Sequence, residues 1–508
     1  GFYSAFMVAE KVEIFTKSYK DEPAAHWTCD GSPEFSLEPC DKTDRGTEIV
    51  LHVAEDSLEF LEESKIRELL NKYNKFMPIP IKFGTKTETL PKPEDAPEDY
   101  TAETIEVDNI INNPNPAWTK QPVDLKDEDY KNFYRELYPM QFEEPLFHIH
   151  LNVDYPFNLT GILYFPKLGA DLQIQRDKIQ LFQNQVYVTD NVEGIVPEFL
   201  MMLRGVVDSP DIPLNVSRSG LQADGAVKKI SNYITRKVAD KLKSLFNENR
   251  ADFETKWNDI KIVLEYGMLS EDKFYEKAGA FVLYPTVDDK YFTLDELKEA
   301  IKENQTDKDG KLVVLYAGNK EAQHSYIEIA KDKGYQVLLL DSPIIPHLIQ
   351  KLESDNSGLT FVRVDSDHID NLIKKEETAI SKLSTEEQES LKTVVETIVP
   401  KQTYTVQLEA LDSSAAPFII TQPEFMRRMK EMSQTGGGGM FGMGNFPEMY
   451  NLVVNTNSDL ATSILNNEDK TVQENLVKQA LDLAKLSQNL LKGEALTAFV
   501  KRSFEMIK

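Results

Sequence analysis

The sequence predicts a protein of several domains that combine α/β and α+β architecture. Its 508 residues are too many for one hydrophobic core, so we expect three or four domains. A strand–helix–strand pattern over 312–340 indicates a small parallel sheet, because parallel strands need a crossover helix between them. Two helices with apolar stripes, 474–491 and 494–507, predict a helical hairpin in the last part of the chain.

The charge and cysteine content limit the classes of partner and compartment. Lys and Arg number 57 and Asp and Glu number 84, which gives a formal net charge of −27. This balance argues against nucleic acid as a partner, because a phosphate backbone needs a basic surface. No run approaches the ~18–20 apolar residues of a membrane span. Cys29 and Cys40 are the two cysteines, so we expect a reducing compartment such as the cytoplasm, although a pairing between them stays open.

Residues 1–84 are predicted to form a small α/β unit. Alternation of apolar and polar residues indicates strands over 12–16 and 47–53. A helix over 57–73 presents leucine and isoleucine side chains on one face, and two prolines soon after it flank a short edge strand.

Residues 85–112 are predicted to be an acidic linker. Within 85–109, eight acidic residues stand against two lysines, and three prolines interrupt the segment. Low apolar content and net negative charge favour a solvated segment over a folded element. We therefore expect a domain boundary here.

Residues 113–383 are predicted to form a middle domain of α/β layers. Its larger part extends to about residue 265, and a helical connector leads to a small α/β part at about 280–365. The segments expected in the larger part are a helix over 125–138, strands over 160–166 and 179–189, and helices across 228–265.

Two features of the middle domain are weak candidates for sites. His148 and His150 share one face of a predicted strand, but no cysteine or acidic cluster completes a set of metal ligands, so we expect no metal. Ala317–Asn319 forms the turn after the first strand of the small sheet. One glycine there is not a phosphate-binding fingerprint, so we do not expect a second nucleotide site.

The stretch Pro213–Gln222 carries the candidate chemistry of the chain. It follows an apolar-rich run and leads into a helix for which Ser217 is a suitable N-cap. The helix macrodipole disfavours an arginine at that end. Arg218 is therefore either a surface arginine or a cation that reaches outward to a phosphate, for which its planar fork of donors is suited.

Residues 384–508 are predicted to form the last domain, with a helix over 384–399 and a strand over 403–408. Six of the 13 methionines fall between residues 426 and 449, and Gly436–Gly439 interrupts that region. Flexible, Met-rich surfaces adapt to varied partners, so we predict a protein-binding segment; core packing beside a flexible loop is the alternative. The residues assigned to this binding are Phe425, Met426, Met429, Met432, Met440, Phe441 and Met443.

The helical hairpin predicts self-association. Its apolar stripes have little else in the sequence to cover them, and such hairpins commonly pair about a twofold axis. We therefore expect a homodimer formed through 472–508.

Four segments resemble one family. PLNVSRSGLQ at 213–222, GFYSAFMVA at 1–9, RGTEI at 45–49 and KGEALTAFVKR at 492–502 are similar to the ninety-kilodalton heat-shock chaperones, in particular the bacterial high-temperature protein G branch. The resemblance extends over nearly the whole chain. It implies that residues 1–84 are the C-terminal part of a GHKL-type ATPase sandwich, the fold shared with gyrase B, MutL and histidine kinases.

The resemblance also implies site residues and cofactors. Arg218 would approach the γ-phosphate of ATP, with Mg²⁺ bound, and stabilise the charge that develops during hydrolysis. The family's catalytic glutamate, magnesium-holding asparagine and adenine-binding aspartate lie upstream of the matching region. We therefore expect that the chain lacks the N-terminal half of the ATPase domain, binds ATP poorly and is inactive by itself. The residues carried over are Asn215, Arg218 and Gln222 as catalytic, and Gly1, Phe2, Thr47 and Arg218 as cofactor-binding.

The function implied is that of an ATP-driven chaperone of the stress response, a cytoplasmic homodimeric clamp that binds partly folded clients. No MEEVD tail follows Lys508, so co-chaperones that read such a tail are not expected. Two alternatives remain. One is an ATP-independent dimeric scaffold in which Arg218 has no role; the other is a different GHKL ATPase, which the charge of −27 disfavours for any enzyme that faces DNA.

Overall fold

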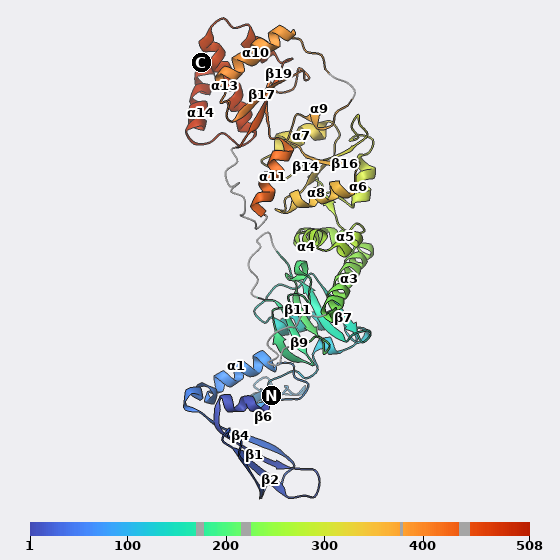
Figure 1. The fold of residues 1–508 in the computed structure, drawn as a ribbon, viewed down its shortest axis with the longest axis vertical. Coiled ribbons are helices and arrows are strands. Elements are labelled where there is room, and N and C mark those ends of the chain that lie inside the picture. Colours follow the sequence, from blue (N-terminus) through green and yellow to red (C-terminus); the bar gives the residue numbers. More distant parts are fainter. Residues whose placement is uncertain (169–176, 215–224, 376–378, 436–447, 508) are drawn as a thin grey trace. The chain divides into compact units, whose positions relative to one another are not determined.

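The computed structural model describes residues 1–168, 177–214, 225–375, 379–435 and 448–507 (Figure 1). The chain divides into two compact units, and both contain helices and sheets, which confirms the mixed multidomain fold class. The first unit comprises Gly1–Tyr164, Arg176–Ile195 and Leu203–Ile230, and the second comprises Phe165–Gln175, Val196–Met202 and Ser231–Lys508.

The first unit begins with a four-stranded antiparallel sheet of order β3-β2-β1-β4. Ile14 lies opposite Trp27 on one neighbouring strand and opposite Ile49 on the other, so these side chains share a face. The elements are η1 Phe2–Met7, β1 Ala9–Lys17, β2 Ala24–Cys29, β3 Phe35–Cys40, β4 Gly46–Val53, η2 Glu55–Leu61 and α1 Glu63–Tyr73.

This region confirms the two predicted strands and corrects other expectations. The single helix expected over 57–73 is wrong, because Glu62 is extended (φ −81°, ψ 128°) and separates η2 from α1. Residues 78–80 form no strand. Strands β2 and β3 were not predicted. They place Cys29 and Cys40 at opposite ends of one strand pair, so the two free thiols are too far apart for a disulfide.

The acidic segment contains a β-hairpin, so the expectation of no folded element over 85–109 is wrong. Strand β5 (Lys82–Thr89) pairs antiparallel with β6 (Thr104–Ile110). The ladder satisfies the backbone, and the charged side chains stay exposed on both strands. The buried Asn112 side chain ties the hairpin's far end to residues 77–81: its oxygen accepts from the Ile81 amide at 2.7 Å.

A five-stranded sheet of order β10-β9-β11-β8-β7 follows in the chain. The predicted strand 179–189 is a hairpin, since Asn184 and Gln185 adopt positive φ (50° and 66°) between β9 and β10. Helix α2, within the predicted helix 125–138, buries Tyr130, Phe133, Tyr134 and Leu137 in an aromatic core. The elements are η3 Ala117–Thr119, η4 Pro122–Asp124, α2 Asp127–Leu137, β7 Phe147–Val153, β8 Leu159–Phe165, β9 Ile179–Gln183, β10 Val186–Thr189, η5 Glu198–Leu200 and β11 Arg204–Asp208.

The second unit contains the connector helices and the small α/β part. The predicted strand–helix–strand is confirmed: β14 and β15 are parallel and joined through α7, and β16 extends the sheet in the order β15-β14-β16. The elements are α3 Gly225–Glu248, α4 Arg250–Ser270, α5 Asp272–Ala278, β12 Tyr284–Pro285, β13 Tyr291–Phe292, α6 Leu294–Ile301, β14 Leu312–Ala317, α7 His324–Asp332, β15 Val337–Leu339, α8 Ile345–Asp355, β16 Leu359–Arg363 and α9 Ile369–Leu372.

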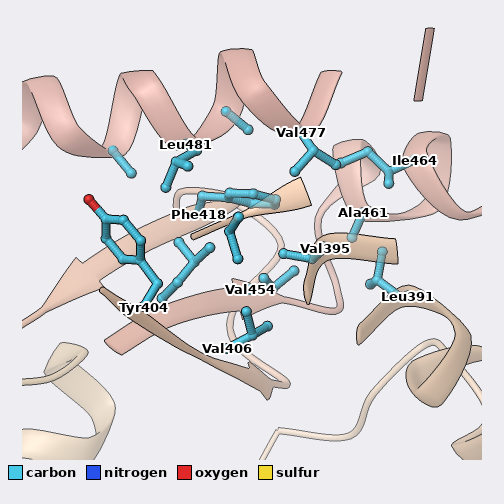
Figure 2. Close-up of a cluster of buried hydrophobic side chains, with 14 of the residues drawn as sticks. Leu391, Val395, Tyr404, Val406, Phe418, Val454, Ala461, Ile464, Val477 and Leu481 are labelled. Atoms are coloured by element: carbon cyan, nitrogen blue, oxygen red, sulfur yellow. The ribbon is translucent and has the colours of Figure 1, made fainter. Parts of the chain in front are cut away.

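The last part of the chain has a sheet of order β17-β19-β18 with its own core. Figure 2 shows Val477 and Leu481 of one helix facing Phe418 of the sheet. Ser384 caps the first helix and forms a capping box with Glu387. The elements are α10 Thr385–Ile398, β17 Tyr404–Glu409, β18 Phe418–Thr421, α11 Glu424–Thr435, β19 Tyr450–Asn455, α12 Asp459–Leu465, α13 Lys470–Ser487 and α14 Gly493–Ile507.

The small α/β part and the last part have separate cores that touch. Ile419 of β18 packs against the small α/β core. The hydroxyl of Tyr326 on α7 donates to the Ile420 carbonyl at 2.7 Å, and the Gln488 side chain donates to the same carbonyl at 2.8 Å. These contacts join the two parts at β18, the strand that directly precedes α11 in the chain.

Candidate functional site

Asn215, Arg218 and Gln222 lie at 215–224, outside the described residues. The chain on either side of them is firmly held. Gln183 donates to the carbonyls of Pro210 and Ile212 at 3.3 and 3.4 Å, and Asp211 accepts from the Asn158 amide at 2.6 Å. After the segment, α3 buries Val227 and Ile230.

Strand β11, which leads to this segment, is fastened by a buried aspartate. Asp208 accepts hydrogen bonds from the amides of Asn184 and Gln185, both at 2.9 Å, and from the Trp118 indole at 3.2 Å. Burial raises the pKa of Asp208 in spite of these three donors. The Gln185 side chain donates to the carbonyls of Phe76 and Pro114, each at 2.9 Å, so it serves the packing of this region.

Two of the residues assigned to a nucleotide, Phe2 and Thr47, lie at one open sheet face, while Arg218 is outside the described residues. Phe2 packs edge-on against Trp27, with ring centroids 6.0 Å apart. Thr47 pairs with Thr16, and their hydroxyls are 2.8 Å apart. Register places Thr47 and Trp27 on the same face but two strands apart, and Gly1 and Thr47 are both exposed. These residues form part of one wall and do not enclose a nucleotide.

The weak candidates have structural roles. The ring of Tyr130 stacks on His148 at 3.6 Å, and its hydroxyl lies 2.8 Å from Nδ1 of His150. Across the part of the chain that the structure describes, no group of three or more ligating side chains is placed to hold a metal ion. At the 317–319 turn, Gln323 accepts from the amides of Gly318 and Asn319 at 2.8 and 3.3 Å, so a side chain occupies the position of a phosphate.

Helix α11 places its apolar side chains in solvent. Phe425 is 71% exposed, and Met426 and Met429 are 45% and 46% exposed, while Met432 is half-buried. Their spacing puts them on one side of the helix, and we name these four residues the apolar stripe. Met440, Phe441 and Met443 lie outside the described residues.

The opposite side of α11 is charged and buried. Arg427 is the buried residue of this helix, at 4% exposure. Its NH1 lies 3.1 and 3.0 Å from the two carboxylate oxygens of Glu431, and its NH2 donates to the Tyr316 hydroxyl at 2.7 Å. Burial raises the pKa of Glu424, but Arg427 and Arg428 outweigh it, so the pKa lies below the usual value and the carboxylate stays charged.

Sequence reasoning identified the stripe but missed this buried charge. The signal was present, since Glu424, Arg427, Arg428 and Glu431 follow the same i, i+3, i+4, i+7 spacing as an apolar face. Which of the two faces turns inward depends on residues far along the chain.

The comparisons with known proteins define the class of this chain. The profile of the family described as Hsp90 protein matches residues 92–489. The chain therefore belongs to the Hsp90 family.

The particular relatives are bacterial and carry the name chaperone protein HtpG. The protein of Bacteroides thetaiotaomicron is 48% identical over 575 aligned residues, which cover 100% of this chain and 83% of the relative. That of Porphyromonas gingivalis strain ATCC 33277 is 52% identical over 490 residues, or 96% of this chain and 70% of the relative. A more distant relative, from Clostridium acetobutylicum, is 33% identical over 365 residues, which cover 69% of this chain and 57% of the relative. These relatives support a chaperone function. Among the described helices, none has the length and apolarity needed to cross a bilayer.

Proposed function

We propose that this chain works in an ATP-driven chaperone, a homodimeric clamp that binds partly folded client proteins on the apolar stripe of α11. The observation that carries the proposal is the exposure of Phe425, Met426 and Met429 above a buried charged face. Exposed apolar area is unfavourable in water, so a helix that keeps it is suited to a partner with apolar area of its own.

Methionine suits a client surface of this kind. Its side chain is unbranched and polarisable, so one stripe can fit many apolar sequences. In an ATP-independent scaffold, the alternative function, the same stripe would bind clients with an affinity that ATP does not change.

The ATP part of the proposal rests on the family. We propose that Arg218 supplies a fixed positive charge to the γ-phosphate and that Asn215 and Gln222 support it. Because Phe2 and Thr47 lie on an open face, we expect the 508-residue chain to bind Mg-ATP weakly by itself. A cytoplasmic location belongs to the same proposal.

The experiment replaces two stripe residues together. Met426→Ser with Met429→Ser should weaken binding of a reduced, carboxymethylated protein that cannot refold by about tenfold, the size of losing one or two contact hot spots. Binding is measured by fluorescence anisotropy of the labelled, unfolded protein. Met140→Ser is the matched control, because Met140 is 79% exposed elsewhere in the chain. Equal affinities in all three proteins would reject the stripe as the client surface.

A further inference from the structure

We infer that the buried ion network beneath α11 holds this helix with its apolar stripe outward, so that Tyr316, Glu424 and Arg427 are positioning residues for client binding. We name the set Tyr316, Glu353, Arg363, Glu424, Arg427, Arg428 and Glu431 the α11 anchor. The inference rests on the proposed function of the stripe, but its first readout does not require a client.

Helix α11 buries its charged side and exposes its apolar side. An amphipathic helix on a folded surface normally buries its apolar side and exposes its charges. In α11 the arginine at 427 is 4% exposed and the phenylalanine at 425 is 71% exposed. Burial of apolar area therefore does not explain how α11 is oriented.

The surface under α11 explains the orientation, because it offers polar partners from three elements. The Tyr316 hydroxyl of β14 donates to Glu424 at 2.6 Å. The backbone amide of Arg363 in β16 donates to the other oxygen of Glu424 at 3.1 Å. Glu353 of α8 lies 2.8 Å from NH1 of Arg428, whose Nε also donates to Glu424 at 2.8 Å.

Rotation of α11 by half a turn would bury the stripe but would leave these partners unmatched. Glu353 and the Arg363 amide are partly buried, and a buried charge or donor without a partner is strongly unfavourable. The rotated arrangement is therefore excluded by the polar surface rather than by the helix itself.

The hydrogen bonds of the α11 anchor are directional, so they can define how the helix is rotated about its axis. Arg427 contacts Glu431 through NH1, reaches Tyr316 and Glu424 through NH2, and lies 5.7 Å over the Tyr316 ring. Such charge-assisted bonds need defined angles, so they fix the rotation of the helix about its axis, which non-directional apolar burial cannot do. At the other end, Thr435 lies 2.9 Å from Nε2 of His347 on α8.

The test uses one variant inside the helix and one outside it. Tyr316→Phe removes a single hydroxyl from β14 and keeps the ring, so it carries little risk to the fold. Arg427→Met removes the charge while keeping a long side chain. We expect amide hydrogen exchange over 424–435 to become about tenfold faster in Arg427→Met, the size of losing a hydrogen bond to a charged group, and faster by a smaller factor in Tyr316→Phe.

Client affinity should fall in both variants, in the same order as the rise in exchange. Lys430→Gln is the matched control, because Lys430 belongs to the same helix but pairs with the exposed Glu448 and the change adds no apolar group to the stripe. It should change neither readout. Exchange over α13 serves as the internal reference for the integrity of the last domain.

Unchanged exchange over 424–435 in both anchor variants would overturn the inference. Faster exchange with full client affinity would also overturn it, because the anchor would then not be needed to present the stripe. Failure of the proposed function would look different. In that case the double variant Met426→Ser with Met429→Ser would keep full affinity, whatever the anchor variants show.

Discussion

At the scale of the residue, Glu265 is a carboxyl group that the fold keeps out of water. It lies on α4 at 5% exposure, and its Oε2 has no hydrogen-bond partner in the described structure. Burial raises the pKa of Glu265 to about 7, although the Ser342 hydroxyl and Lys261 act in the opposite direction. The charged form is therefore disfavoured near neutral pH.

This shift predicts a dependence of stability on pH. The folded pKa of about 7 is above the ordinary value of 4.5, so the folded protein binds this proton more tightly than the unfolded chain. The favourable contribution is present below pH 4.5 and is lost as the pH rises through about 7. It amounts to up to about 3 kcal/mol, at about 1.4 kcal/mol per pH unit.

Glu265→Gln should therefore stabilise the protein at pH 8 and change little at pH 5, measured by calorimetric unfolding at the two values. Glu276→Gln, on the neighbouring helix α5, is the control because Glu276 is exposed. Parallel pH profiles for wild type and Glu265→Gln would show that Glu265 does not titrate as inferred.

The positive charge of Arg218 leads to a prediction about the rate of ATP hydrolysis. When this chain is joined to a complete ATPase domain of the family, Arg218→Ala should lower the rate of ATP hydrolysis by about 10³-fold, the lower end of the effect of an arginine finger. Nucleotide affinity should stay nearly unchanged, because the charge is needed in the transition state. Steady-state turnover measures the hydrolysis rate, and a nucleotide titration measures the affinity. Normal turnover would remove Arg218 from the mechanism.

At the scale of the element, helix α4 depends on a residue without a side chain. A Cβ on Gly267 would lie 2.6 Å from the Phe199 ring and 2.8 Å from the Phe274 ring. Both rings are fully buried, with centroids 4.8 Å apart, so neither has room to move.

Gly267→Ala should lower the free energy of unfolding by about 1–3 kcal/mol through overpacking, which outweighs the ~1 kcal/mol that alanine gains in helix propensity. Chemical denaturation, followed by the fluorescence of the buried Trp257 on the same helix, measures the change. Gly279→Ala is the matched control, because no atom lies within 4 Å of its Cβ position and its φ of −55° is helical. A neutral Gly267→Ala would mean that the rings can shift.

How far the sequence predicts these elements depends on where their stabilisation comes from. The strand–helix–strand of 312–340 and the buried face of α2 were predictable, because their apolar periodicity is local. Strands β5 and β6 were not, since their charged residues resemble a solvated segment until the two strands pair. The orientation of α11 was equally hidden: Tyr316 and Glu353, which decide it, are 108 and 71 positions before Glu424.

At the scale of the whole molecule, the last two helices predict a homodimer. The exposed apolar side chains of α13 and α14 include Leu483 at 50%, Phe504 at 66% and Ile507 at 81%. The hairpin itself is internally fixed, because Gln479 donates to Ser503 at 2.9 Å and Arg502 donates to Gln479 at 2.8 Å. In the proposed homodimer these apolar side chains would therefore meet a second copy without first being ordered.

Phe504→Ser with Ile507→Ser should raise the dimer dissociation constant at least about tenfold, since buried aromatic anchors dominate such interfaces. Sedimentation equilibrium measures it. Phe142→Ser, at a position 92% exposed elsewhere in the chain, should leave the mass unchanged. A monomeric wild-type chain would refute the role of 472–508.

The position of the anchored helix α11 bears on how many contacts one client could make at the same time. Met440 follows Thr435, the last residue of α11, by five positions in the sequence, a span of at most about 17 Å for a fully extended chain. If Met440 and Phe441 bind clients as the sequence predicts, a client segment held by the stripe would reach them in an intramolecular step, without a new diffusional encounter. In a dimer each client would meet two stripes and two segments that contain Met440 and Phe441. Its release would require several weak contacts to break at the same time. Avidity, rather than any single strong contact, would then set how long a client stays bound.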